Sequence, residues 1–345
     1  MTLETTRAQH GRLFKAIAAA ALALMILVLA YVGIRDHAAT RNVPAEKLSI
    51  ALPTLPYFAL VHVAAAQGYL AEEGLDVSIL PVSHGVAAID NVLQGTANLA
   101  VATEVPFVIS VMKGNALAII ATVGNATNDN SIIARRDRAI ADARDLAGKK
   151  VGVTFGAGSS YFLWTFLIGH KLAPDSIQMV NVPPNRIVEA LTNGSVDAVA
   201  TWQPISLEAQ AALGDNAVSL ANAGINGTTS VMAGRSEFLK GNAKTIENVA
   251  RALLKAEQFM RLHPEQTLSL VAKWLRTDVD ALRPTWKDFN FRVSLLQTQL
   301  TSMEGQSRWA MARGYVETRP VPNFLSNLYL DALLAVAPER VTVIR

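Results

Sequence analysis

Short apolar runs alternate with segments of helical spacing along most of the chain, and this alternation predicts an α/β fold. Such runs of four to eight residues, bounded by glycine, proline or asparagine, are typical of buried strands. The order of strand and helix then begins again near Lys150. The expected strands lie at 48–52, 76–82, 98–103 and 116–123 in the first set, and at 150–154, 177–182 and 196–201 in the second.

The two sets resemble each other residue by residue. Residues 92–101 align with residues 191–200, and in both segments a glycine ends the helix and Asn98 or Asp197 opens the strand. This repeat predicts two small doubly wound α/β lobes that face each other. Ligands of open α/β sheets bind beyond the carboxyl ends of the strands, so the facing ends predict a cleft.

The chain is expected to pass between the lobes twice, at the strand-like runs 131–135 and 228–233. Beyond Arg235 helical spacing dominates, with helices expected at 244–262, 265–275, 278–286 and 293–315 and a short one near 327–334. The predicted organisation is a cytoplasmic segment 1–15, an apolar helix 16–34, a linker 35–46, lobe 1 in two parts at 47–131 and 231–345, and lobe 2 at 132–230.

The apolar run from Ala16 to Ile34 carries no charge and follows several basic residues. At about 1.5 Å per residue it reaches roughly 28 Å, close to the thickness of the hydrocarbon core of a bilayer. We favour an uncleaved transmembrane anchor. A cleavable signal stays open, because Val28 to Ala30 offers a small-x-small site if the apolar core ends at Leu27. Both interpretations place the bulk of the chain outside the cytosol.

Composition narrows the class of protein. Hydrophobic residues make up 51% and charged residues 17%, which supports a large core and argues against widespread disorder. A net charge of +3 without a basic, aromatic-rich cluster argues against nucleic-acid binding. The chain has no cysteine, which excludes disulfides, thiolate chemistry and a lipid-modified cysteine.

The most informative stretch is 149–164, which predicts a strand, a Gly-Ala-Gly turn and a helix start. Ser159 or Ser160 is expected to cap this helix and leave backbone N–H groups facing outward, which suits a small anion. The stretch lacks the spacing of a Walker phosphate loop or a dinucleotide site. An ordinary strand-to-helix connection remains the alternative interpretation.

Several motifs in sequence order carry a resemblance to a known family. They lie at 69–77 (YLAEEGLDV), 93–95 (LQG), 145–153 (DLAGKKVGV) and 193–199 (NGSVDAV). Over residues 47–240 the chain resembles the periplasmic substrate-binding proteins of ABC importers for sulfonates, taurine, nitrate and thiamine-precursor pyrimidines. The resemblance implies a two-lobed type II binding-protein fold that holds a small solute between the lobes. It also implies delivery to an ABC permease and its ATPase from the periplasmic side of the inner membrane.

By position, the resemblance implies that the cleft is lined by loops at 53–58, 83–85, 103–105, 156–161 and 202–204. The candidate ligand-binding residues in these loops are Thr54, Tyr57, Phe58, His84, Thr103, Glu104, Gly158, Ser159, Ser160, Tyr161, Trp202 and Gln203. Core packing is the alternative for Tyr57, Phe58 and Trp202. For Glu104 the choice is between a partner for a ligand N–H group and a solvated residue at the rim, and for His84 between an anion donor and an exposed turn residue.

No residues with the spacing of a catalytic centre or a metal site are found, and no cofactor is expected. These cleft loops contain no arginine, which argues against a strongly charged anion such as sulfate. Two further functions stay open. One is an enzyme on the same scaffold, of the pyrimidine-precursor synthase type, for which these loops offer no lysine and a single histidine. The other is a membrane-tethered sensory module.

Overall fold

The computed structural model describes residues 45–220 and 227–344. The fold described below is that of the unit Glu46–Arg345. The predicted segment 1–15, the predicted apolar helix at 16–34 and the predicted linker up to residue 44 lie outside the described residues. Glu46, the last residue of the predicted linker, begins the first strand. Within the two described ranges, no helix combines the length and the apolar composition that crossing a bilayer requires.

Two mixed β-sheets organise the unit, and each defines a lobe. Lobe 1 is built on a six-stranded sheet in the order β11-β4-β10-β3-β1-β2. Lobe 2 is built on a five-stranded sheet in the order β7-β6-β8-β5-β9. The lobe 1 strands are β1 (Glu46–Pro53), β2 (Leu75–Val82), β3 (Leu99–Thr103), β4 (Leu117–Ala126), β10 (Thr228–Arg235) and β11 (Phe289–Asn290). The lobe 2 strands are β5 (Asn130–Arg135), β6 (Lys150–Val153), β7 (Gln178–Asn181), β8 (Ala198–Trp202) and β9 (Ala217–Leu220).

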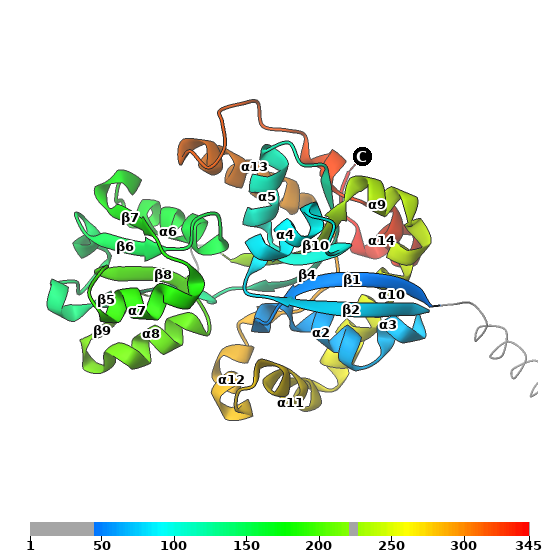
Figure 1. Ribbon diagram of the computed structural model, residues 1–345, viewed down its shortest axis with the longest axis horizontal. Helices are drawn as coiled ribbons and strands as arrows, with labels where there is room; N and C mark the ends of the chain where they lie inside the picture. The colour runs from blue at the N-terminus through cyan, green and yellow to red at the C-terminus, as the bar shows by residue number, and fades with distance from the viewer. Residues whose placement is uncertain (1–44, 221–226, 345) are drawn as a thin grey trace, which may run out of the picture. The chain divides into compact units, whose positions relative to one another are not determined.

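The two sheets share one topology, in keeping with the internal repeat of the sequence. In lobe 1, β1 runs parallel to β2 and β3, and β10 returns antiparallel between β3 and β4. In lobe 2, β6 runs parallel to β7 and β8, and β5 returns antiparallel between β8 and β9. The strands β5 and β10 therefore occupy equivalent places, and each follows a passage of the chain from one lobe to the other. Figure 1 shows lobe 2 as the green middle of the chain, whereas lobe 1 combines its blue and its yellow-to-red parts.

Helices cover the sheets where the apolar periodicity changes from two to about 3.6 residues. The longest helix buries Ile246, Val249, Leu253 and Met260 at helical spacing. The helices of lobe 1 are α2 (Ala59–Ala66), α3 (Tyr69–Glu72), α4 (Gly85–Leu93), α5 (Glu104–Met112), α9 (Ser236–Gly241), α10 (Ala243–Leu262), α11 (Pro264–Leu275), α12 (Val279–Trp286), α13 (Gln297–Ala312) and α14 (Asp331–Val336). The helices of lobe 2 are α6 (Gly158–Gly169), α7 (Ile187–Thr192) and α8 (Ile205–Leu213).

The structure differs from the predicted helices at one clear place. A single helix was expected over 293–315, but α13 begins only at Gln297. The residues before it are extended, because Ser294 forms a bridge with Thr122 of β4 and Leu295 forms one with Val341. Pairing with a strand that lies far away in the sequence overrides the local helical spacing here.

Helix α13 reaches from lobe 1 to lobe 2. It packs on α5, and its Trp309 ring lies 5.2 Å from the ring of Tyr161 on α6, measured between centroids. Just beyond the helix, Arg313 pairs with Asp175 of lobe 2 at 2.6 Å. The lobes are thus joined by side-chain contacts as well as by the chain itself.

Candidate functional site

A pocket lies where the strand ends of the two lobes meet. Tyr57 follows β1 and Thr103 ends β3 in lobe 1, while Ser159 follows β6 and Trp202 ends β8 in lobe 2. The cavity measures about 20 Å³, and we call it the cleft pocket. It is lined by Tyr57, His84, Gly85, Thr103, Pro106, Asp129, Asn130, Ala157, Gly158, Ser159, Trp202 and Thr228. This volume holds about one water molecule, so a larger solute enters only if the lobes move apart.

The start of α6 contributes unpaired donors to the cleft pocket. Gly156 turns the chain with a φ of 76°, a left-handed conformation that glycine adopts without strain. Gly158 and Ser159 belong to the first turn of the helix, whose backbone N–H groups have no partner within the helix. The Ser159 hydroxyl is fully buried and has no hydrogen-bond partner within the described residues. Donors and the positive end of the helix dipole therefore meet in the pocket.

The predicted cap of this helix is wrong. We expected Ser159 or Ser160 to cap it, but α6 begins one residue earlier, and Ala157 takes the N-cap position without a side-chain bond. Ser160 is fully buried within the helix, where its hydroxyl donates to the carbonyl oxygen of Ala157 at 2.7 Å. Of these two serines, only Ser159 lines the cleft pocket. Because its hydroxyl has no partner within the described residues, it is available to bind a ligand.

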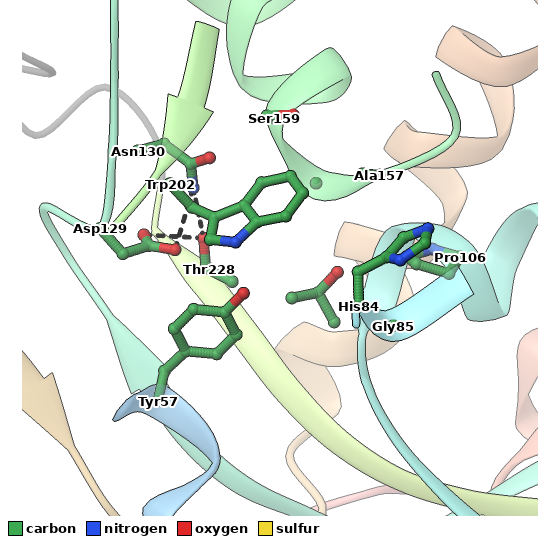
Figure 2. Close-up of a pocket in the computed structure, with 12 residues that line it drawn as sticks. Tyr57, His84, Gly85, Pro106, Asp129, Asn130, Ala157, Ser159, Trp202 and Thr228 are labelled. Carbon is green, nitrogen blue, oxygen red and sulfur yellow. Dashed lines mark hydrogen bonds between the residues drawn. The ribbon is translucent and has the colours of Figure 1, made fainter. Parts of the chain in front are cut away.

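The lobes lie close together at Gly158. A Cβ atom at this position would lie 3.4 Å from Oγ1 of Thr103 in lobe 1. A larger side chain would therefore hold the lobes apart. Facing this contact, the Trp202 side chain is 4% exposed, and its Nε1–H group has no hydrogen-bond partner within the described residues. Figure 2 shows the Trp202 ring between Tyr57 and the start of α6.

A hydrogen-bonded triad of Asp129, Asn130 and Thr228 closes one side of the pocket (Figure 2). Thr228 Oγ1 donates to Asp129 Oδ1 at 2.9 Å, and Asn130 Nδ2 donates to Asp129 Oδ2 at 3.0 Å. Burial raises the pKa of Asp129 to about 6, although these two hydrogen bonds act in the opposite direction. The pocket therefore contains a carboxyl group whose charge changes in the mildly acidic range.

The sequence analysis missed this triad. Asp129 lies in the passage between β4 and β5, and Thr228 begins β10 after the second passage. A signal was present, because three polar residues at 128–130 precede the predicted crossing at 131–135. Polar residues at a buried crossing between two lobes are candidates for a site at their boundary.

His84 and Tyr57 also line the pocket. The His84 ring shares a 2.7 Å hydrogen bond between Nδ1 and the hydroxyl of Ser83. Burial lowers the pKa of His84, against the opposing charge of Asp90. The imidazole is therefore mainly neutral at pH 7. Tyr57 is 5% exposed, and burial followed by the charge of Asp129 raises its pKa well above the usual range, so it remains a neutral phenol.

Other candidates lie away from the cleft pocket. Phe58 is 1% exposed in the core, with its ring centroid 4.4 Å from that of Tyr57. Tyr161 packs on Trp309 and does not line the pocket. Thr54 and Gln203 line a separate cavity of about 280 Å³ between α8 and the α11–α12 region.

Glu104 differs from both expectations, since it neither lines the cleft pocket nor lies solvated at a rim. It is 3% exposed under α13, where its Oε2 atom accepts from Ser302 Oγ at 2.7 Å and from Gln306 Nε2 at 3.0 Å. Burial raises its pKa to about 7, and the bonds from α13 partly offset this rise. Its Oε1 atom, the Oε1 atom of Gln306 and both side-chain polar atoms of Gln299 have no partner within the described residues.

A metal site finds no support in the described part of the chain. Within it, no group of three or more histidine, aspartate or glutamate side chains is placed to hold an ion. The chemistry of the cleft pocket is that of neutral donors, an aromatic wall and one buried carboxyl group.

Comparisons with known proteins agree with this architecture. An alkanesulfonate-binding protein from Xanthomonas axonopodis pv. citri, solved with MOPS bound, superposes with a TM-score of 0.73 at 17% identity, covering 83% of this chain and 99% of that one. This likeness shows the periplasmic-binding-protein fold. Residues 55–267, more than half of the chain, match the family model described as "NMT1/THI5 like", and the chain belongs to that family.

Two curated relatives match at lower coverage. A putative binding protein of Brucella abortus (strain 2308) is 26% identical over 137 residues, which are 39% of this chain and 43% of the relative. The taurine-binding periplasmic protein of Escherichia coli (strain K12) is 20% identical over 206 residues, 59% of this chain and 63% of the relative. The matched region thus spans less than half of the Brucella relative.

Proposed function

We propose that the chain is the extracytoplasmic solute-binding component of an ABC importer, and that it captures a small organic anion or zwitterion between its lobes. The observation that carries the proposal is the pair of buried, unpartnered donors, Ser159 Oγ and Trp202 Nε1, facing one pocket from two elements. A buried donor without a partner costs about 1–3 kcal/mol, which an oxygen-bearing ligand recovers. Family membership and the name of the taurine-binding relative support the same role.

Binding rather than catalysis is the activity proposed for the pocket. The relatives named above are binding proteins. The lobes would close on the solute, and the closed form would be the one that a permease and its ATPase recognise. We place the protein on the periplasmic side of the inner membrane, held by the 16–34 segment or released after its cleavage. The mass of the mature N-terminus from membrane and periplasmic fractions decides between these two.

Calorimetry on the full-length chain tests the proposal, with taurine, ethanesulfonate, nitrate and an aminopyrimidine as ligands at pH 5 and pH 8. Taurine and ethanesulfonate form a matched pair that differs by one ammonium group. Because the pKa of Asp129 is about 6, its carboxylate is charged at pH 8. A zwitterion site then binds taurine more tightly than ethanesulfonate at pH 8, and an anion site does the reverse. A folded protein that binds none of these solutes at either pH would overturn the proposal.

A further inference from the structure

A short segment of lobe 1 lies against lobe 2 beside the turn that lines the cleft pocket. It comprises residues 309–315, the end of α13 and the residues just after it, and we call it the clasp. Lobe 2 is contacted by three of its side chains, Trp309, Arg313 and Tyr315. The clasp therefore joins the lobes although it belongs to neither passage of the chain between them.

Two of these side chains contact lobe 2 outside the cleft pocket. The Trp309 ring meets the Tyr161 ring of α6 edge to face at a centroid distance of 5.2 Å. Arg313 pairs with Asp175 at 2.6 Å, and its other terminal nitrogen lies 3.5 Å from the sulfur of Met179 on β7. Because the Asp175 side chain is 87% exposed, this ion pair contributes little to the joining of the lobes.

The third side chain, Tyr315, lies against the turn between β6 and α6. Its ring meets the Phe155 ring edge to face at 5.9 Å and lies 4.9 Å from the Trp309 ring, measured between centroids. Burial raises the pKa of Tyr315, and hydrogen bonding with the Ser160 side chain and the Gly156 backbone opposes this rise. The phenol is therefore neutral at pH 7, and its hydroxyl lies where it can hold a turn of lobe 2 from lobe 1.

The turn that Tyr315 contacts also supplies a donor of the cleft pocket. Ser159 lies between Gly156 and Ser160 in the sequence, and its buried hydroxyl has no partner among the described residues. Ser160 is itself tied to this turn, because its hydroxyl donates to the carbonyl oxygen of Ala157 at 2.7 Å. A shift of the turn therefore changes the direction in which the Ser159 hydroxyl points.

We propose that Tyr315 is a positioning residue for the ligand site, and that it holds the first turn of α6 so that Ser159 faces the cleft pocket when the lobes are closed. This inference rests on the proposed function and adds a control on that same site. Because Tyr315 belongs to lobe 1 and the turn belongs to lobe 2, opening of the lobes separates them and closing brings them together. The Tyr315 hydroxyl thus fixes the donor in the closed form and favours that form.

The variant Tyr315→Phe tests this role, because it removes the hydroxyl and keeps the ring. Tyr69→Phe is the matched control, since Tyr69 is a half-buried tyrosine of lobe 1 that lies on α3 and does not line the cleft pocket. Hydrogen–deuterium exchange is measured on the full-length chains in lipid nanodiscs without ligand, at the backbone amides of residues 157–163. We expect exchange there to be about fivefold faster in Tyr315→Phe and unchanged in Tyr69→Phe. Equal exchange in both variants and the wild type would overturn the inference.

Ligand binding measures the consequence for the site. Calorimetry and stopped-flow fluorescence use taurine or ethanesulfonate, whichever the wild type binds more tightly. We expect Tyr315→Phe to bind about fivefold more weakly through faster dissociation, and Tyr69→Phe to match the wild type. Fewer binding sites with an unchanged dissociation rate would indicate a loss of folded protein alone and contradict the positioning role. Unchanged binding by Tyr315→Phe would overturn the inference and leave the proposed function standing, whereas a wild type that binds neither solute would count against both.

A double-mutant cycle tests the contact by a second route. Ser160→Ala removes one partner of the Tyr315 hydroxyl, and its loss of the bond to Ala157 is the same in both backgrounds. The combined effect of Ser160→Ala and Tyr315→Phe on the dissociation constant is expected to be smaller than the product of the two single effects. Thermal unfolding followed by circular dichroism confirms that each variant is folded before titration. Effects that multiply would show that the two residues act independently and contradict the contact.

Discussion

Replacing Glu104 by glutamine is expected to stabilise the protein at neutral and alkaline pH. Burial raises the pKa of Glu104 from 4.5 to about 7, which corresponds to roughly 3 kcal/mol at about 1.36 kcal/mol per tenfold change in proton affinity. Below pH 4.5 the carboxyl is neutral in the folded and the unfolded chain, and its full contribution to stability is present. Between pH 4.5 and 7 only the unfolded chain releases the proton, so the folded state loses stability.

The substitution also fits the hydrogen bonding around this side chain. Glutamine keeps one oxygen to accept from Ser302 and Gln306. Its amide nitrogen takes the place of the unpartnered Oε1 atom, and the side-chain oxygens of Gln299 and Gln306, two residues that act on the Glu104 carboxyl, also have no partner within the described residues. The variant is therefore expected to match the wild type at pH 4 and to exceed it by up to ~3 kcal/mol at pH 8.

Urea unfolding of the full-length chain at pH 4 and pH 8, followed by circular dichroism, measures both free energies. Other buried carboxyl groups such as Asp129 contribute equally to both proteins and cancel in the comparison. Glu317→Gln serves as the control, because Glu317 is exposed and lies outside the helices, so its change should shift neither value. The reasoning is refuted if Glu104→Gln gains no stability over the wild type between pH 4 and pH 8.

Three further predictions concern the pocket and the core. Trp202→Phe keeps the aromatic wall but removes the Nε1–H donor, so ligand affinity measured by calorimetry should drop about tenfold with little change in the urea midpoint. Asp129→Asn removes the buried charge, and the difference in affinity between taurine and ethanesulfonate at pH 8 should shrink; an unchanged difference would show that the carboxylate does not face the head group. Gly234→Ala would bring a Cβ atom to 2.9 Å from Leu99 Cδ2, so the free energy of unfolding should fall by ~1–3 kcal/mol, and an unchanged urea midpoint would contradict the tight packing there.

The carboxyl ends of the strands, where the site lies, could be predicted from the sequence because strands are marked by local sequence patterns. Apolar runs bounded by glycine and proline mark the strands, and the residues just beyond their carboxyl ends include Tyr57, Ser159 and Trp202. This rule does not tell which of two adjacent residues faces the pocket. Tyr57 lines the pocket whereas Phe58 enters the core, because a single 3₁₀ turn at Pro56–Phe58 sets which ring faces inward.

Contacts between distant parts of the chain account for what the sequence did not reveal. Glu104 occupies the equivalent of a rim position after β3, but α13 arrives from far along the chain and covers it with Ser302 and Gln306. Asp129 and Thr228 meet although 99 residues separate them. No local pattern encodes either meeting, since both depend on which segments the fold brings together.

The bond between Thr228 and Asp129 also ties together the two places where the chain passes from lobe to lobe. Two connections held side by side in this way form a hinge, which permits rotation of the lobes about one axis and restricts sliding and twisting. During such a rotation, residues near the hinge axis move little, whereas residues on the walls far from the axis move over a longer distance. If the proposed closure turns about this bond, solute contacts near Asp129 would form before the lobes close, and the walls farther from the bond would then limit the size and shape of the solute.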